Sequence, residues 1–202
     1  MNRRSLLALL VIAVALTGCD GKPSFKNTDV TGLTYAQDFR LTDHTGKPRS
    51  LADFRGKVVS IFFGYTQCPD VCPTTMSEMN AVLQKLSPAD AAKVQVLFIT
   101  VDPERDTQAL LAEYVPAFNK SFLGLRGDLD ATAKTAKDFK VFYQKVPGKA
   151  PGSYTMDHTA GSYVYDPQGR VRLFVRHGAP GEDPSVSIGR VASDIKLLLD
   201  GN

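Results

Sequence analysis

Two cysteines separated by three residues stand in the segment Cys68-Pro69-Asp70-Val71-Cys72. On a helix, this spacing places two side chains about one turn apart on the same side. Two sulfurs so placed can form a disulfide with each other or bind one thiophilic metal ion. A third soft-metal donor, His158, follows far downstream. The residues therefore predict either a redox pair or a metal site.

A metal site of two thiolates and one imidazole suits Cu(I) and can also hold Cu(II). A structural zinc site normally has a fourth protein ligand, and none is evident in the sequence. A single histidine is more often a surface or core residue, so the metal interpretation requires His158 to lie near the cysteines. For His44, in a predicted turn, and His177, at a predicted strand end, we expect structural roles.

Two other interpretations account for the cysteines without a metal. The first is a periplasmic thiol-disulfide oxidoreductase or thiol peroxidase, although oxidoreductases usually have two residues between their cysteines. A peroxidase would pair its nucleophile with a nearby Thr and Arg, for which Thr66 and Arg105 are available, but His158 would then have no role. The second is an inert lipoprotein domain with a buried disulfide. So short a disulfide loop contributes little chain entropy to stability.

The N-terminus has the order of a secretory signal. Arg3 and Arg4 precede an apolar run over residues 6–16, and Leu16-Thr17-Gly18-Cys19 follows. The run is short of the roughly 20 residues that span a bilayer as a helix. The ending resembles a bacterial lipobox, which implies a signal peptide over residues 1–18 and an acylated Cys19. An ordinary signal peptide that contains a cysteine is the alternative.

The rest of the chain is expected to form a tether and one domain. Residues 19–34 are polar and are predicted to be the acylated N-terminus and tether, and residues 35–202 are long enough for one packed core. Removal of residues 1–18 takes away two of 24 basic residues and none of 21 acidic ones, which lowers the net charge from +3 to about +1. We therefore expect no nucleic-acid partner.

Apolar periodicity predicts alternating strands and helices in this domain. Strands are expected at 39–42, 58–63 and 94–101, helices at 73–86, 110–118, 131–139 and 188–198, and a hairpin of 162–165 with 171–175. This order indicates an α/β fold, a thioredoxin-like sandwich with an added N-terminal hairpin and an inserted helix.

The cysteines fall where the first central strand ends and its helix begins, which is where open α/β sheets bind ligands. Free N–H groups at a helix start favour a thiolate, and Asp70 is a plausible cap for that helix. His158 lies in a polar stretch, residues 155–159, which we expect to be a loop passing near the helix start.

Three motifs, in this order, resemble the Sco (SenC) family of copper proteins, and the resemblance runs from about residue 32 to residue 199. They are Phe63-Gly64-Tyr65-Thr66-Gln67-Cys68-Pro69-Asp70-Val71-Cys72-Pro73, then Val101-Asp102-Pro103-Glu104-Arg105-Asp106-Thr107, then Asp157-His158-Thr159.

The resemblance implies a membrane-tethered copper chaperone with a thioredoxin fold that helps to assemble the binuclear copper centre of cytochrome c oxidase. Such a protein delivers copper to the copper-accepting subunit, reduces that subunit's cysteines, or does both. Cys68, Cys72 and His158 match the family's copper ligands. Asp102 matches an acidic residue near that site, and otherwise it forms a turn before Pro103.

The implied partners also include a periplasmic copper donor and a thiol reductase. Asp20 resembles a signal that keeps lipoproteins on the inner membrane, so the expected location is its periplasmic face. Two features depart from the family pattern. Gln67 stands where many relatives have His, and the expected anchor is a lipid instead of a transmembrane helix.

Overall fold

A central eight-stranded sheet organises the protein in the computed structural model, which describes residues 24–177, 181 and 183–201. The predicted signal peptide and Cys19 lie outside these residues. The strand order is β1-β10-β9-β4-β5-β6-β2-β3. Strands β4, β5 and β6 are parallel, and the remaining neighbours are antiparallel. The bounds are β1 Thr28–Asp29, β2 Leu41–Asp43, β3 Pro48–Arg49, β4 Val58–Gly64, β5 Val94–Thr100, β6 Leu123–Arg126, β9 Ser162–Tyr165 and β10 Val171–Val175.

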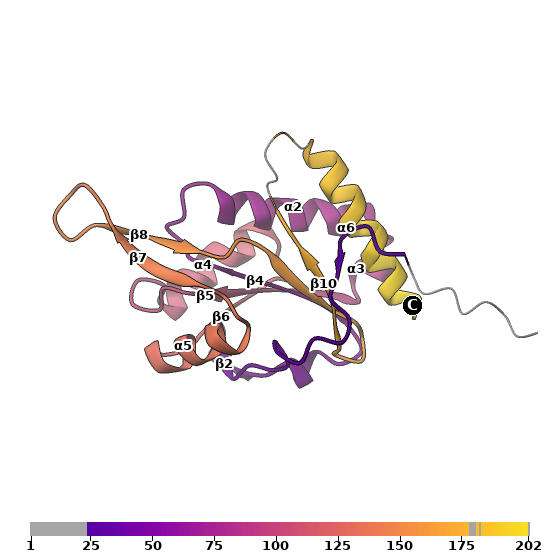
Figure 1. The fold of residues 1–202 in the computed structure, drawn as a ribbon, viewed down its shortest axis with the longest axis horizontal. Helices are drawn as coiled ribbons and strands as arrows, with labels where there is room; N and C mark the ends of the chain where they lie inside the picture. Colours follow the sequence, from indigo (N-terminus) through magenta and orange to yellow (C-terminus); the bar gives the residue numbers. More distant parts are fainter. Residues whose placement is uncertain (1–23, 178–180, 182, 202) are drawn as a thin grey trace, which may run out of the picture.

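Five α-helices and a short 3-10 helix accompany the sheet in the part of the chain that the structure describes. They are η2 Leu51–Phe54, α2 Val71–Lys85, α3 Pro88–Ala91, α4 Gln108–Phe118, α5 Leu129–Asp138 and α6 Pro184–Leu199. Figure 1 shows α2 and α6 together on one side of the sheet and α5 on the other.

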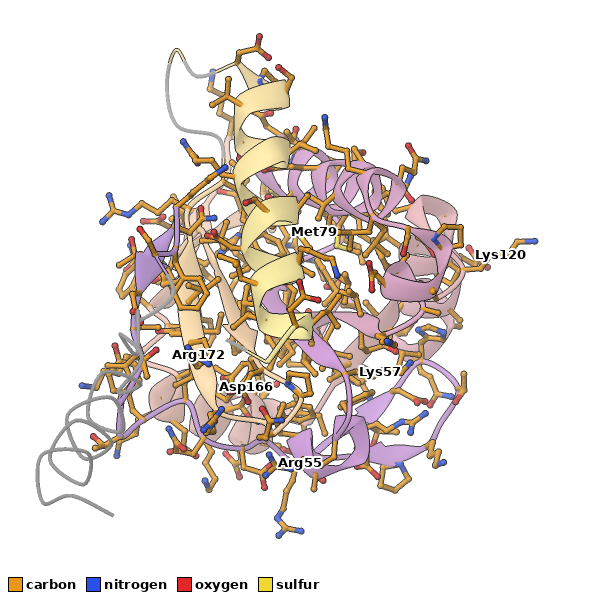
Figure 2. All side chains as sticks on the ribbon, turned by 90° about the vertical axis from the view of Figure 1, so that its right-hand side faces the viewer. Arg55, Lys57, Met79, Lys120, Asp166 and Arg172 are labelled. Atoms are coloured by element: carbon orange, nitrogen blue, oxygen red, sulfur yellow. The ribbon has the colours of Figure 1, made fainter. Side chains whose placement is uncertain are left out.

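The apolar residues of β4 connect these layers because successive side chains of a strand point to opposite faces. The Phe63 ring packs on Phe139, next to α5, at 5.2 Å between centroids. The Phe62 ring points the other way and packs on Phe98, which in turn contacts Tyr114 of α4. All seven residues of β4 and all seven of β5 are buried, as these mainly apolar runs predict. In Figure 2, Met79 of α2 lies beside α6 on the face that α6 covers.

A separate two-stranded sheet consists of β7 Tyr143–Pro147 and β8 Tyr154–His158. This hairpin extends from the body of the domain (Figure 1). In its register, Tyr143 pairs with His158. The prediction of a loop at residues 155–159 was therefore wrong: these residues up to His158 pair with β7, a partner that their own polar sequence does not reveal.

The α/β prediction is confirmed, including the early hairpin, which is β2 with β3 at one sheet edge. The structure differs at residues 24–34, which we expected to belong to the tether. Strand β1 pairs with β10, and the backbone N–H groups of Lys26 and Asn27 donate to the buried carboxylate of Asp194. This segment is thus part of the folded domain, because it completes an edge of the sheet.

Candidate metal centre

The first two donors lie where β4 passes into α2. Cys68 precedes the helix and Cys72 is its second residue. The backbone N–H of Cys72 donates to the Sγ atom of Cys68 at 3.4 Å. Asp70 occupies the N-cap position, but its side chain makes no capping hydrogen bond, contrary to our expectation. Instead, the sulfur of Cys68 accepts a hydrogen bond from the backbone N–H of Cys72, one of the N–H groups that a helix start leaves unpaired.

The third donor reaches the cysteines from the separate hairpin. His158 is the last residue of β8, and its Nε2 atom lies 3.7 Å from Sγ of Cys72. The ligand atoms of Cys68, Cys72 and His158 all lie within 4.8 Å of one another. No further His, Cys, Asp or Glu of the described residues joins this cluster. Both thiols are free. The proximity that the metal interpretation required is confirmed.

The imidazole of His158 is held by contacts on its other sides. Its Nδ1 atom lies 3.1 Å from the carbonyl oxygen of Thr159, to which a protonated Nδ1 donates. This tautomer leaves the lone pair of Nε2 facing the sulfur of Cys72. The rings of Phe62 and Tyr65 pack edge-to-face against it. Burial lowers the pKa of His158, which favours the neutral ring that metal binding requires.

Cys72 does not have the readily ionised thiol that its place at a helix start suggested. Its side chain is fully buried, and burial, followed by the hydrogen bond with Cys68, raises its pKa well above the usual value for cysteine. An apolar environment penalises the charged form more than the helix start favours it. Burial therefore favours the protonated thiol of Cys72 in the metal-free protein, and metal binding must displace this proton.

Gly64 lies directly against the buried sulfur of Cys72. A Cβ atom on Gly64, the last residue of β4, would lie 2.9 Å from Sγ of Cys72 and 2.8 Å from the ring of Phe98. The absence of a side chain at Gly64 thus lets the buried sulfur pack directly on the strand.

Asp102 lies outside the three-donor cluster, and both of its carboxylate oxygens accept hydrogen bonds from other side chains. Its carboxylate accepts from Nε of Arg105 at 2.5 Å and from the hydroxyl of Tyr154 at 2.9 Å. Its carbonyl oxygen accepts the backbone N–H of Asp106, which forms the expected turn after β5. Asp102 therefore joins this turn to the start of β8.

Sequence reasoning missed the roles of Tyr154 and Gln67, both of which contact Arg105. The sequence signal that could have revealed these contacts is the polar motif directly after β5. Because β4 and β5 are adjacent parallel strands, the residues that follow them meet at one edge of the sheet.

The two residues considered for a peroxidase are engaged in other contacts. The hydroxyl of Thr66 donates to Asp106, and Arg105 binds Asp102, Gln67 and Tyr154.

The other two histidines have the structural roles that we expected. Nδ1 of His44 accepts the backbone N–H of Gly124 at 3.0 Å. His177 is buried between the carboxylate of Glu78, at 2.9 Å, and the hydroxyl of Ser162, at 2.7 Å.

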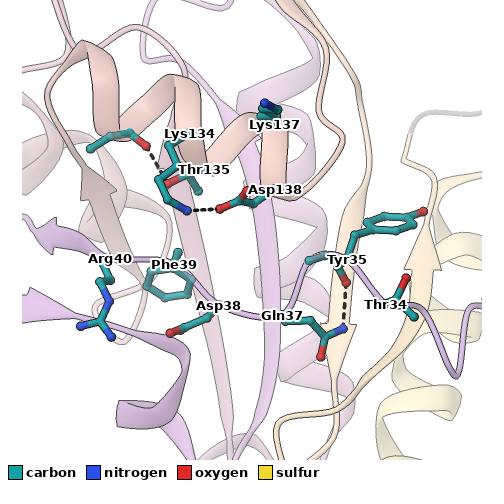
Figure 3. A pocket seen from close by; sticks show the side chains of 12 residues that line it. Thr34, Tyr35, Gln37, Asp38, Phe39, Arg40, Lys134, Thr135, Lys137 and Asp138 are labelled. Atoms are coloured by element: carbon teal, nitrogen blue, oxygen red, sulfur yellow. Dashed lines mark hydrogen bonds and ion pairs between the residues drawn. The ribbon is translucent and has the colours of Figure 1, made fainter.

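A cavity of about 650 Å³ lies elsewhere, between residues 34–40 and α5 (Figure 3). Its lining includes none of the three donors. Lys134 and Asp138 on its wall form an ion pair with each other.

Among the described residues, none of the helices has the length and apolar composition that a bilayer-spanning helix needs.

The arrangement of two sulfurs and one imidazole nitrogen matches the donor preference of copper. The profile of the SCO1/SenC family matches residues 28–193. The chain belongs to the SCO1/SenC family. Its fold agrees with this: ScoI of Bradyrhizobium japonicum, solved with copper bound, is 42% identical with a TM-score of 0.69, over 80% of this chain and 98% of that one.

A second solved SCO1/SenC structure, apo Sco1 of Thermus thermophilus, is 39% identical with a TM-score of 0.73, over 89% of this chain and 99% of that one. The mitochondrial SCO2 homologue of Mus musculus is 42% identical over 133 residues, 65% of this chain and 52% of the relative. The bovine one is 38% identical over 163 residues, 80% of this chain and 61% of the relative. The chain thus spans about half to three-fifths of these curated relatives.

Proposed function

We propose that this protein is a membrane-anchored copper chaperone that binds copper through Cys68, Cys72 and His158. It delivers the ion to the copper-accepting subunit of cytochrome c oxidase, for assembly of the binuclear copper centre. The observation that carries this proposal is the convergence of two free thiols and a neutral imidazole within 4.8 Å. Membership of the SCO1/SenC family and the copper-bound relative support it.

The donor set suits a cargo ion better than a permanent one. Two thiolates satisfy Cu(I), and the imidazole adds the nitrogen that Cu(II) prefers. Three protein donors leave room for a ligand of the accepting protein to enter before the chaperone's own ligands leave. Cys68, the more exposed of the two sulfurs, is the ligand that such a partner reaches first.

A second activity, reduction of the target's cysteines, uses the same thiols. The Cys68 thiolate attacks a target disulfide and forms a mixed disulfide, which releases one target thiol. Cys72 then attacks the sulfur of Cys68 as its proton passes to the leaving target sulfur, which releases the second target thiol and leaves a Cys68–Cys72 disulfide. The target gains two electrons that this protein loses, so a thiol reductase must restore the dithiol. A periplasmic copper donor then reloads it.

The proposed location is the periplasmic face of the inner membrane. The basic and apolar N-terminal segment directs export, and acylation of Cys19 supplies the anchor. The folded domain is then held near the membrane by the short stretch before residue 24.

Copper titration of the domain in two redox states tests the proposal. The reduced protein should bind one Cu(I), and the disulfide form should bind essentially none at this site, because metal binding requires free thiolates. Equal uptake by both forms at matched pH would show that these sulfurs are not ligands. A reduced protein that binds no copper but reduces a disulfide substrate would support the purely redox alternative.

A further inference from the structure

The hairpin that carries His158 is not part of the central sheet. Strands β7 and β8 pair only with each other and extend from the domain, as Figure 1 shows. The cysteines, in contrast, are fixed to the end of β4 in the core. Residues 159–161 join His158 to β9 of the central sheet, so the orientation of the hairpin toward the two sulfurs depends on this short link and on side-chain contacts with the rest of the domain.

Arg105 makes a set of contacts that joins the two parts. Its Nη1 atom donates to the side-chain Oε1 of Gln67 at 3.0 Å and to the carbonyl oxygen of Tyr154 at 2.9 Å. Gln67 directly precedes Cys68, and Tyr154 is the first residue of β8. One guanidinium thus bridges the cysteine loop and the strand that ends at His158.

The guanidinium is itself fixed in place. Its Nε atom donates to the buried carboxylate of Asp102, and its Cζ atom lies 3.6 Å from the centroid of the Tyr154 ring. The Tyr154 hydroxyl donates to the other oxygen of Asp102. A planar group with several donors can make all these contacts at once, whereas the single ammonium group of lysine cannot.

We propose that Arg105 is a positioning residue, which holds the β7–β8 hairpin against the cysteine loop and so keeps Nε2 of His158 within ligand distance of the sulfurs. Arg105 acts through His158 and does not contact the metal. This inference rests on the proposed function, in which His158 is a copper ligand.

Arg105→Lys keeps the positive charge and removes the bridge. We expect it to weaken Cu(II) binding about tenfold, the lower end of what loss of outer contacts around metal ligands costs. Cu(I) binding should change less, because two thiolates suffice for it. The matched control is Lys145→Gln. Lys145 is also a cation over the Tyr154 ring, at 4.8 Å, but it pairs with Glu104 instead of the cysteine loop.

Gln67→Ala is a milder second variant, because it removes only one contact of Arg105. It should weaken Cu(II) binding in the same direction and by a smaller factor. It also keeps the proposal testable if Arg105→Lys impairs folding, which circular dichroism of both variants would reveal.

A double-mutant cycle with His158→Ala distinguishes positioning from a general loss of stability. If Arg105 acts through His158, Arg105→Lys should not weaken Cu(II) binding further when His158 is already absent. The sulfur-to-Cu(II) absorption band of Arg105→Lys should also shift toward that of His158→Ala. An equal loss in both backgrounds, or a loss no larger than that of Lys145→Gln, would overturn the proposal.

A measurement without copper separates this inference from the proposed function. Hydrogen exchange of the backbone amides of residues 154–158 should be faster in Arg105→Lys than in the wild type and in Lys145→Gln. Unchanged exchange would refute the positioning role even if copper binds. Faster exchange in a protein that binds no copper would confirm that Arg105 holds the hairpin and refute the copper function.

Discussion

The Nε2 atom of His158 lies 3.7 Å from the Sγ atom of Cys72, although 86 positions separate the two residues in the chain. The imidazole comes from a hairpin outside the main sheet, and the thiol comes from a helix that begins at the centre of that sheet. Two independent parts of the fold thus supply one donor set. The consequences of this arrangement can be measured separately for each donor.

Replacement of His158 by alanine should separate the two oxidation states of copper. Cu(II) affinity should fall by more than about 100-fold, since changes in outer-shell partners alone cost about 10–100-fold. Cu(I) affinity should fall less, and the Cys68–Cys72 disulfide should still form. Competition with a chelator measures both affinities, and His44→Ala is the control, because that imidazole lies outside the cluster. Unchanged affinity in both states would show that His158 is not a ligand.

The two thiols should differ in their reaction with disulfides. Cys68 is partly exposed, whereas Cys72 is buried with a raised pKa, so Cys68 attacks first. Cys72→Ser should therefore accumulate a mixed disulfide with a small disulfide reagent, and Cys68→Ser should accumulate little. Mass spectrometry of the trapped adducts measures this difference. Equal trapping by the two variants would contradict the assignment of Cys68 as the attacking thiol.

Asp43 should contribute to stability in a pH-dependent manner. Burial alone would raise its pKa, but hydrogen bonds from the side chains of Thr45 and Arg49 and from the backbone of Lys47 and Thr45 outweigh burial and lower it to about 2. Because the folded-state pKa lies below the unfolded value, this contribution is present above about pH 4 and is lost as the pH falls toward about 2.

Asp43→Asn should thus lower the free energy of unfolding by about 2 kcal/mol near neutral pH. The difference from the wild type should shrink as the pH falls from about 4 to about 2. Urea unfolding of the copper-free domain across this range measures both. A difference that is independent of pH would show that the charge of Asp43 is not the source of its contribution.

Cys19→Ser should prevent acylation and leave the protein unprocessed or released from the membrane. Radiolabelled fatty-acid incorporation and membrane fractionation measure the two effects. Cys68→Ser is the control, because it removes a thiol from the folded domain and should leave acylation unchanged. Normal processing and membrane retention of Cys19→Ser would exclude a lipid anchor at this residue.

The sequence by itself determined the elements whose signals are local. The mainly apolar runs of β4 and β5 indicated two buried strands, and the helical spacing of Met76, Met79 and Leu83 indicated a helix. Together they place Cys68 and Cys72 at a strand-to-helix junction. The types of the three donors also indicated copper, because donor softness is a property of the side chains themselves.

Only the tertiary structure decided how these donors meet and how they ionise. The pairing of β8 with β7, the bridge from Asp102 to Tyr154 and the packing of Phe62 on His158 each join residues far apart in the chain. The raised pKa of Cys72 likewise follows from burial in the completed core, which outweighs the local effect of the helix start. Desolvation depends on everything packed around a group, so no stretch of neighbouring residues could reveal it.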